Sequence, residues 1–226
     1  MAENEKKEIR EEIEKLGQIE VKNGKYRIHI MTVIGEIEGH ECLNSNTKTT
    51  KYEHVLPELA RIEESEDIDG ILVLINSVGG DVESGLAISE MLASIDKPVV
   101  TLVLGGSHSI AVPLAVSGDY SFIVPTGTMV IHPVRMNGLF IGASQTYDYF
   151  KKIQDRITEF ICTHCEIKEE RLYQLMMETE ELTKDIGSIL VGKETVKEGI
   201  IQEVGGIHSA FLKLHEIIEE RMEKRK

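Results

Sequence analysis

The chain has 226 residues, of which 41% are hydrophobic, and this is enough to bury a core as one domain with or without a helical appendage. A formal net charge of −14, with no basic stripe, argues against binding to nucleic acid, whose phosphates attract clusters of Lys and Arg. Three cysteines are too few for a disulfide framework. The first residues lack the apolar segment of a signal peptide, and no run approaches the ~20 apolar residues of a membrane helix. We therefore expect a cytoplasmic protein without membrane insertion.

The N-terminal part of the chain predicts a charged arm followed by a strand, a loop and a helix. Residues 1–22 are rich in charged side chains with a weak helical spacing of apolar residues, so they are assigned to an N-terminal helix or arm. Alternation over residues 26–35 predicts a strand. Residues 39–51 are polar and aperiodic, which is typical of an exposed loop. Apolar residues at helical spacing predict a helix over 53–64.

From Gly70 onward, short apolar runs alternate with helical patterns. Strands are expected at 71–75, 99–104, 120–124 and 129–132, and helices at 83–95, 144–165, 168–178, 194–198 and 209–224. This alternation predicts one α/β domain over residues 23–208, with a projecting helix at 144–165 and a C-terminal helix within 209–226. The segment from Cys162 to Cys165 has no second ligand pair elsewhere, so its cysteines are interpreted as small helix residues and no metal is expected.

Three segments at expected strand ends carry the parts of an acyl-transfer site. Gly79-Gly80 lies between a strand and a helix, where glycine dihedrals allow backbone amides to point into a cleft and stabilise an oxyanion. Ser109 follows a glycine-rich turn at the start of an apolar helix, although serine in such a place is often only an N-cap. Ser107 is the competing nucleophile, and His108, which lies between the two serines, is poorly placed to act as a base for Ser109, because adjacent side chains point apart.

His132, at the end of an apolar strand, is the candidate general base, and it needs an acid that fixes its tautomer. A histidine at a strand end is otherwise often a satisfied core or rim residue. Asp185 is the candidate acid, with Glu180 and Glu181 as alternatives, because the sequence alone does not choose among them.

At these residues the sequence resembles the proteolytic subunit family of Clp proteases, and within it the translocation-enhancing branch. The segments that carry the resemblance are Asn76–Val82, Ser109 with its preceding glycines, Val130–Pro133, and Gly138–Gln145 leading into the long helix. The resemblance implies a spiral of ββα units, as in the crotonase-like fold, with the long helix as a handle between two stacked rings.

The resemblance also implies roles for individual residues. It makes Ser109 the nucleophile, His132 the base and the amides of Gly80 and Ile110 the oxyanion hole. Gly138, Leu139, Phe140 and Ile141 would bind an extended peptide, no cofactor would be needed, and a homo-oligomeric ring would act on polypeptide substrates in protein export or quality control. The 39–51 loop is longer than in the main family and lies near the surface where unfoldases dock. The resemblance therefore does not decide whether this chain has an ATPase partner.

The sequence departs from the family pattern at two positions, and the second of them favours an alternative function for the same fold. Ala111 stands where the family has glycine, and a gap-free alignment places Gly187, not Asp185, at the position of the catalytic aspartate. A catalytically weak or inactive scaffold is therefore the alternative function. Crotonase-like acyl-CoA chemistry and a serine–lysine dyad using Lys193 rank below both, because no residue specifically supports them.

Overall fold

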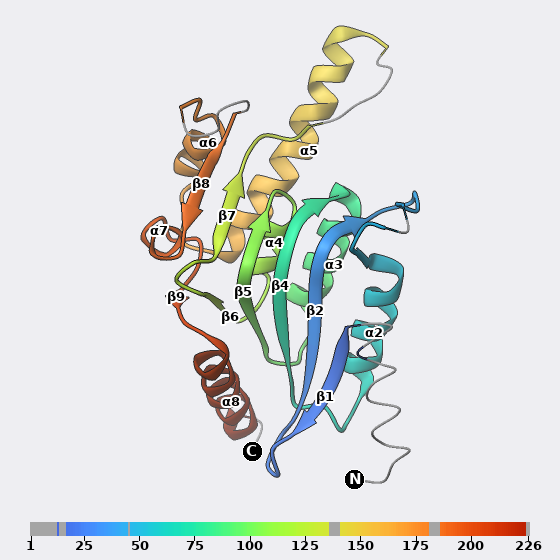
Figure 1. Ribbon diagram of the computed structural model, residues 1–226, viewed down its shortest axis with the longest axis vertical. Coiled ribbons are helices and arrows are strands. Elements are labelled where there is room, and N and C mark those ends of the chain that lie inside the picture. Colours follow the sequence, from blue (N-terminus) through green and yellow to red (C-terminus); the bar gives the residue numbers. More distant parts are fainter. Residues whose placement is uncertain (1–12, 14–16, 45, 136–140, 181–185, 225–226) are drawn as a thin grey trace.

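The centre of the protein is a mostly parallel β-sheet. The structure, a computed structural model, describes residues 13, 17–44, 46–135, 141–180 and 186–224. Strands run across the sheet in the order β1-β2-β4-β5-β6-β9, with β3 beside β2, and with β7 between β5 and β8 (Figure 1). The strands are β1 (Gln18–Lys22), β2 (Arg27–Glu38), β3 (Thr49–Lys51), β4 (Gly70–Gly80), β5 (Val99–His108), β6 (Tyr120–Ile123), β7 (Thr128–Ile131), β8 (Ser188–Val191) and β9 (Glu203–Val204).

Helices connect and cover these strands on both faces of the sheet. They are α2 (Tyr52–Glu64), α3 (Val82–Ser94), α4 (Ala111–Val116), α5 (Ala143–His164), α6 (Glu169–Met176), α7 (Lys193–Lys197) and α8 (Ile207–Lys224). Side chains of α2 to α6 form the larger apolar core with one face of the sheet. The smaller core lies on the other face, where Leu214 and Ile218 of α8 pack on Leu72, Val100 and Leu102.

The central parallel strands β4 and β5 are buried over most of their length. Ile71, Leu72 and Val73 of β4 are fully buried, as are Val100 and Leu102 of β5. Continuous apolar runs of this kind are expected where helices cover both faces of a strand. Only β1 with β2 and β7 with β8 pair in the antiparallel direction among the strands described.

Strand β5 has two different neighbours along one side, and this arrangement positions the site. Its first half pairs with β6, Val100 opposite Tyr120, and its second half pairs with β7, His108 opposite Val130. The residues that follow β5 and β7, namely Ser109 and His132, therefore emerge from neighbouring strands at the same edge of the sheet.

Helix α5 extends beyond the sheet at the end opposite α8 (Figure 1). Its C-terminal part is anchored in the core by Ile153, Ile157 and Phe160, whereas Tyr147 and Tyr149 near its start are 67% and 53% exposed. The expected α/β class with a projecting helix at about 144–165 is confirmed.

Several strand boundaries differ from the sequence prediction. Residues 18–22, assigned to the N-terminal arm, form β1, and residues 49–51, assigned to the exposed loop, form β3 beside β2. Strand β4 continues through Gly80, because its last residues pair with Ile37 of β2 instead of forming a free turn. Residues 1–12 and 14–16 of the predicted N-terminal helix or arm lie outside the described residues.

Candidate active site

Ser109 occupies a sharp turn between strand β5 and helix α4. It has a backbone φ of +56°, in the left-handed region that side chains other than glycine rarely adopt. Ile110 is the N-cap of α4, so the interpretation of Ser109 as a helix N-cap is wrong. A serine held in a strained strand-to-helix turn is the arrangement that exposes the nucleophile in α/β hydrolases, and local strain of about 1–3 kcal/mol persists where the surrounding fold enforces it.

The two residues before Ser109 are engaged elsewhere. Ser107 is fully buried, and its Oγ donates to the carbonyl oxygen of Ala111 at 2.7 Å. His108 Nε2 lies 2.9 Å from Thr128 Oγ1. Burial, and then the nearby charge of His132, lower the pKa of His108 below its ordinary value. Ser109, which is half-buried and lines a pocket, is therefore the serine available for chemistry.

The glycine pair lies against the turn that carries Ser109. A Cβ added to Gly79 would lie 2.8 Å from Ser109 Cβ and 3.3 Å from the Ile110 nitrogen, so only glycine allows this approach. The Asp81 amide donates to the Ile37 carbonyl of β2 at 2.9 Å. Gly79 and Gly80 have φ of +91° and +148°, dihedrals that residues other than glycine rarely adopt. Both predicted oxyanion residues, Gly80 and Ile110, line the same pocket as Ser109.

Asp81 has a structural role beside this glycine pair. Its carboxylate accepts a hydrogen bond from the Ser84 amide at 2.9 Å and is the N-cap of α3. A capping carboxylate satisfies an unpaired helix amide and favours the helix dipole. The capped helix therefore begins at a fixed point directly after Gly80.

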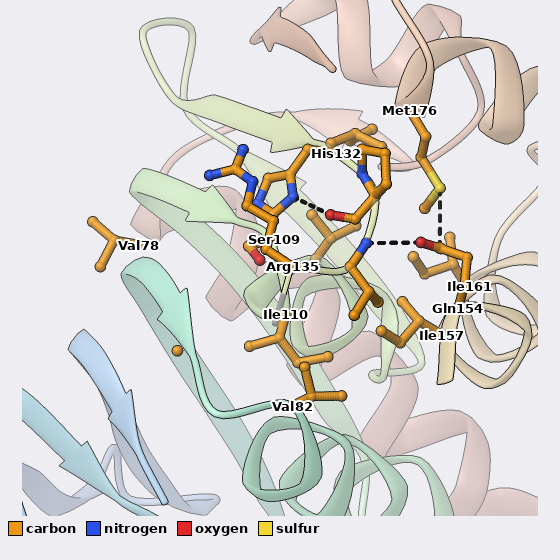
Figure 2. Close-up of a pocket in the computed structure, with 15 residues that line it drawn as sticks. Val78, Val82, Ser109, Ile110, His132, Arg135, Gln154, Ile157, Ile161 and Met176 are labelled. Atoms are coloured by element: carbon orange, nitrogen blue, oxygen red, sulfur yellow. Dashed lines mark hydrogen bonds between the residues drawn. The ribbon is translucent and has the colours of Figure 1, made fainter. Parts of the chain in front are cut away.

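His132 directly follows β7 and faces the same pocket. The Ser109 amide donates to the carbonyl oxygen of Val130 at 2.8 Å, which fixes the turn two residues from His132. The imidazole Nδ1 lies 2.6 Å from the carbonyl oxygen of Pro133. A carbonyl oxygen can only accept a hydrogen bond, so Nδ1 donates here and carries the proton, and Nε2 of the neutral ring keeps its lone pair. Figure 2 shows the half-buried ring beside the Ser109 turn.

The pocket shared by these groups has a volume of about 260 Å³ (Figure 2). Its walls come from β4, the start of α3, the β5–α4 turn, the end of β7 with the segment after it, and helices α4, α5 and α6. The lining side chains beyond the catalytic candidates are Val78, Val82, Val112, Ile131, Pro133, Val134, Arg135, Gln154, Ile157, Ile161 and Met176. Most of these residues are apolar, but polar atoms provide the larger part of the surface that faces the pocket, so hydrogen-bonding groups lie there beside apolar ones.

Gly187 lies directly beside His132. Ile131 pairs with Ser188 in the antiparallel ladder, so Gly187 comes opposite His132. Gly187 has φ +135°, and a Cβ there would lie 2.4 Å from the Ile131 carbonyl oxygen and 2.8 Å from His132 Cβ. The position that the alignment matched to the catalytic aspartate is therefore in contact with the histidine, but it has no room for a side chain in this backbone arrangement.

The remaining predicted site residues are placed only in part. Asp185 and Glu181 lie outside the described residues, and Glu180 is exposed. Of the predicted substrate-binding strand, Gly138, Leu139 and Phe140 also lie outside, while Ile141 is 88% exposed.

Sequence reasoning missed Gln154, which lines the pocket from α5. Its Oε1 accepts from the Val134 amide at 2.8 Å. The available signal was a polar residue inside the apolar stripe of α5, directly after Ile153.

Among the described residues, no group of three or more His, Cys, Asp or Glu side chains is arranged to hold a metal ion. Cys162 and Cys165 are free thiols at the end of α5. Burial raises the pKa of Cys165 to about 11, so its reactive thiolate is scarce at neutral pH. A helix long and apolar enough to cross a membrane was also not found in the described parts of the chain.

The fold brings Ser109 and His132 to one pocket, and this is the arrangement of side chains that serine hydrolases use. In a comparison with known families, the model of the family described as Clp protease matches residues 24–208. The chain belongs to the Clp protease family, and its α/β architecture is the fold of that family.

Individual relatives are similar to different extents. The translocation-enhancing protein TepA of Halalkalibacterium halodurans is 51% identical over 94% of this chain and 84% of that protein. An ATP-dependent Clp protease proteolytic subunit of Leuconostoc citreum is 33% identical over 41% of this chain and 46% of its own length. The corresponding subunit of Lactococcus lactis subsp. cremoris is 24% identical over 66% and 74%.

Proposed function

We propose that this chain is a serine-type endopeptidase that hydrolyses peptide bonds through Ser109 and His132. The observation that carries the proposal is the strained φ of Ser109 in a pocket that it shares with His132 and Gly80. Backbone strain of this kind is retained where it serves a site. The match to the Clp protease family supports the same reaction class.

In the proposed reaction, Ser109 Oγ attacks the peptide carbonyl carbon while His132 Nε2 takes the hydroxyl proton. The carbonyl oxygen becomes an oxyanion that accepts from the amides of Gly80 and Ile110. Removal of one such donor typically lowers turnover by ~10²–10³. The C–N bond then breaks as His132 protonates the leaving amine. Water, deprotonated by His132, hydrolyses the acyl-enzyme and restores Ser109.

Asp185 is proposed as the acid behind His132, and residues 138–141 as the strand beside which the peptide binds. A role in protein export or quality control, carried out in the cytoplasm, is proposed on the basis of the similarity to a translocation-enhancing protein. The three free cysteines agree with a reducing compartment.

A homo-oligomer is part of the proposal because one sheet face is left partly uncovered. Ile34 of β2 pairs with Asn76 of β4, and Leu104 of β5 follows on the same face, beyond the reach of α8. Ile34 and Leu104 are 47% and 45% exposed. Ile34 and Leu104 lie on either side of β4, and apolar residues exposed together on one sheet face typically mark an interface.

Gly187 favours a second candidate function, a scaffold with weak or no peptidase activity. If no carboxylate orients His132, a serine peptidase loses ~10⁴ in turnover. In that case the same peptide-binding pocket would hold a polypeptide without cleaving it.

The two functions are separated by labelling purified, assembled protein with a fluorophosphonate probe and by measuring peptide turnover. For the peptidase we expect labelling at Ser109, its loss in Ser109→Ala and His132→Ala, and a decrease in turnover of ~10⁴ in Asp185→Ala. Assembled wild-type protein that is neither labelled nor active would contradict the peptidase and leave the scaffold.

A further inference from the structure

A continuous chain of hydrogen bonds connects His132 with the pocket wall. His132 Nδ1 bonds to the Pro133 carbonyl oxygen at 2.6 Å, and the Val134 amide donates to Gln154 Oε1 at 2.8 Å. Gln154 Nε2 in turn donates to Met176 Sδ of α6 at 3.2 Å. These bonds are the dashed lines of Figure 2.

The middle of this series of hydrogen bonds is a single peptide unit. The Pro133 carbonyl and the Val134 N–H belong to the same planar peptide group, whose two dipoles are rigidly coupled by resonance. When Gln154 Oε1 holds the N–H end, the carbonyl end is fixed in the position where it accepts from His132. Hydrogen bonds in series also polarise one another, so the carbonyl becomes a better acceptor.

This arrangement determines which ring nitrogen of His132 carries the proton, and the proposed reaction depends on that tautomer. A general base needs its proton on Nδ1 and its lone pair on Nε2, and an acceptor at Nδ1 selects that tautomer. Without an anchor, the Pro133–Val134 peptide would be free to rotate, and the Pro133 carbonyl oxygen would move away from Nδ1 of His132. Gln154 is well suited as the anchor because α5 is held in the core on both sides of it by Ile153 and Ile157.

We propose that Gln154 is a positioning residue for catalysis, which orients His132 through the Pro133–Val134 peptide. The proposal rests on the proposed function of the site. It adds an orienting group supplied by α5, whether or not Asp185 also contributes. Gln154 does not touch the reacting atoms, and its effect passes entirely through the backbone.

The test compares two substitutions at one site with a matched control. Gln154→Leu removes the acceptor for the Val134 amide, whereas Gln154→Glu retains an acceptor at the same distance along the side chain. Gln174→Leu makes the same chemical change at an exposed position of α6 outside the pocket. Peptide turnover is measured against pH, together with the rate of fluorophosphonate labelling.

For Gln154→Leu we expect kcat to fall about five- to tenfold, as for the loss of one hydrogen bond, with a smaller change in KM. The acid limb of its pH profile should move to lower pH, because the imidazolium loses a fixed acceptor. Gln154→Glu should recover most of the turnover and move the limb to higher pH, because its carboxylate favours a protonated His132. Gln174→Leu should behave like wild type.

A second readout does not depend on activity. Hydrogen–deuterium exchange at the C2 carbon of His132, followed by mass spectrometry across pH, reports the protonation of that ring alone. We expect midpoints that shift in opposite directions in Gln154→Leu and Gln154→Glu. Identical midpoints in all variants would overturn the proposal, as would an equal loss of turnover in both Gln154 variants, which indicates packing alone. Inert wild-type protein with shifted midpoints would instead refute the peptidase and retain the orienting role of Gln154.

Discussion

Substitution of Gly187 by alanine tests the close packing beside His132 without altering a candidate catalytic side chain. The new Cβ would lie 2.4 Å from the Ile131 carbonyl oxygen and 2.8 Å from His132 Cβ, distances at which the backbone must move. The φ of +135° adds strain for a residue other than glycine. We expect about 1–2 kcal/mol from the dihedral and about 1–3 kcal/mol from overpacking, hence a loss of about 2–5 kcal/mol in the free energy of unfolding.

The substitution should also slow the reaction at Ser109 in protein that remains folded. Displacement of the histidine by about 1 Å from its working geometry can lower a rate ~10²-fold. We therefore expect folded Gly187→Ala protein to react with a fluorophosphonate about 10- to 100-fold more slowly than wild type. The assay combines denaturant unfolding with labelling rates under conditions in which the protein stays folded.

Gly24→Ala is the matched control for the backbone dihedral. Gly24 also has a positive φ, +88°, but a Cβ there would meet nothing within 4 Å. It should lose only about 1–2 kcal/mol and keep the full labelling rate. The reasoning is refuted if Gly187→Ala unfolds like Gly24→Ala and is labelled at the wild-type rate.

Two further predictions concern the neighbouring serine and a buried histidine. Ser107→Ala should retain labelling at Ser109 but lose about 1–3 kcal/mol in the free energy of unfolding, because the Ala111 carbonyl loses its buried donor. Loss of labelling at unchanged stability would indicate that Ser107 is the nucleophile. Burial lowers the pKa of His29, a lowering that the charge of Arg61 assists and those of Glu58 and Glu20 oppose. Stability should therefore decrease as pH falls below the ordinary histidine pKa of about 6.5, since the unfolded chain then binds the extra proton. His29→Leu should weaken this dependence, as measured by unfolding at pH 5 to 8, and an unchanged slope would contradict the assignment.

The helices of this protein were predictable because their apolar stripes are long and regular. The expected helices at 53–64 and 83–95 correspond to α2 and α3 within a residue at each end. Short strands at the edges were not predictable, because β1 and β3 consist largely of polar residues whose strand character comes from pairing with β2. The extension of β4 through Gly80 has the same cause, a tertiary partner that outweighs the local preference of glycine for turns.

The candidate site was predictable as a set of residues but not as a geometry. Ser109, His132 and Gly80 were identified from their places at strand ends, and the structure brings them to one pocket. The choice between Ser107 and Ser109 depends on a buried hydrogen bond to Ala111, which no local pattern encodes. Gln154 was hidden inside the apolar stripe of α5, because its role depends on a backbone amide 20 residues away.

The strained turn at Ser109 also bears on how this chain changes over evolutionary time. Glycine adopts φ +56° without the steric penalty that serine carries, so replacement of Ser109 by glycine would relieve strain at that position. For a serine that acts as the nucleophile in this turn, selection for the hydroxyl and selection for stability therefore act in opposite directions.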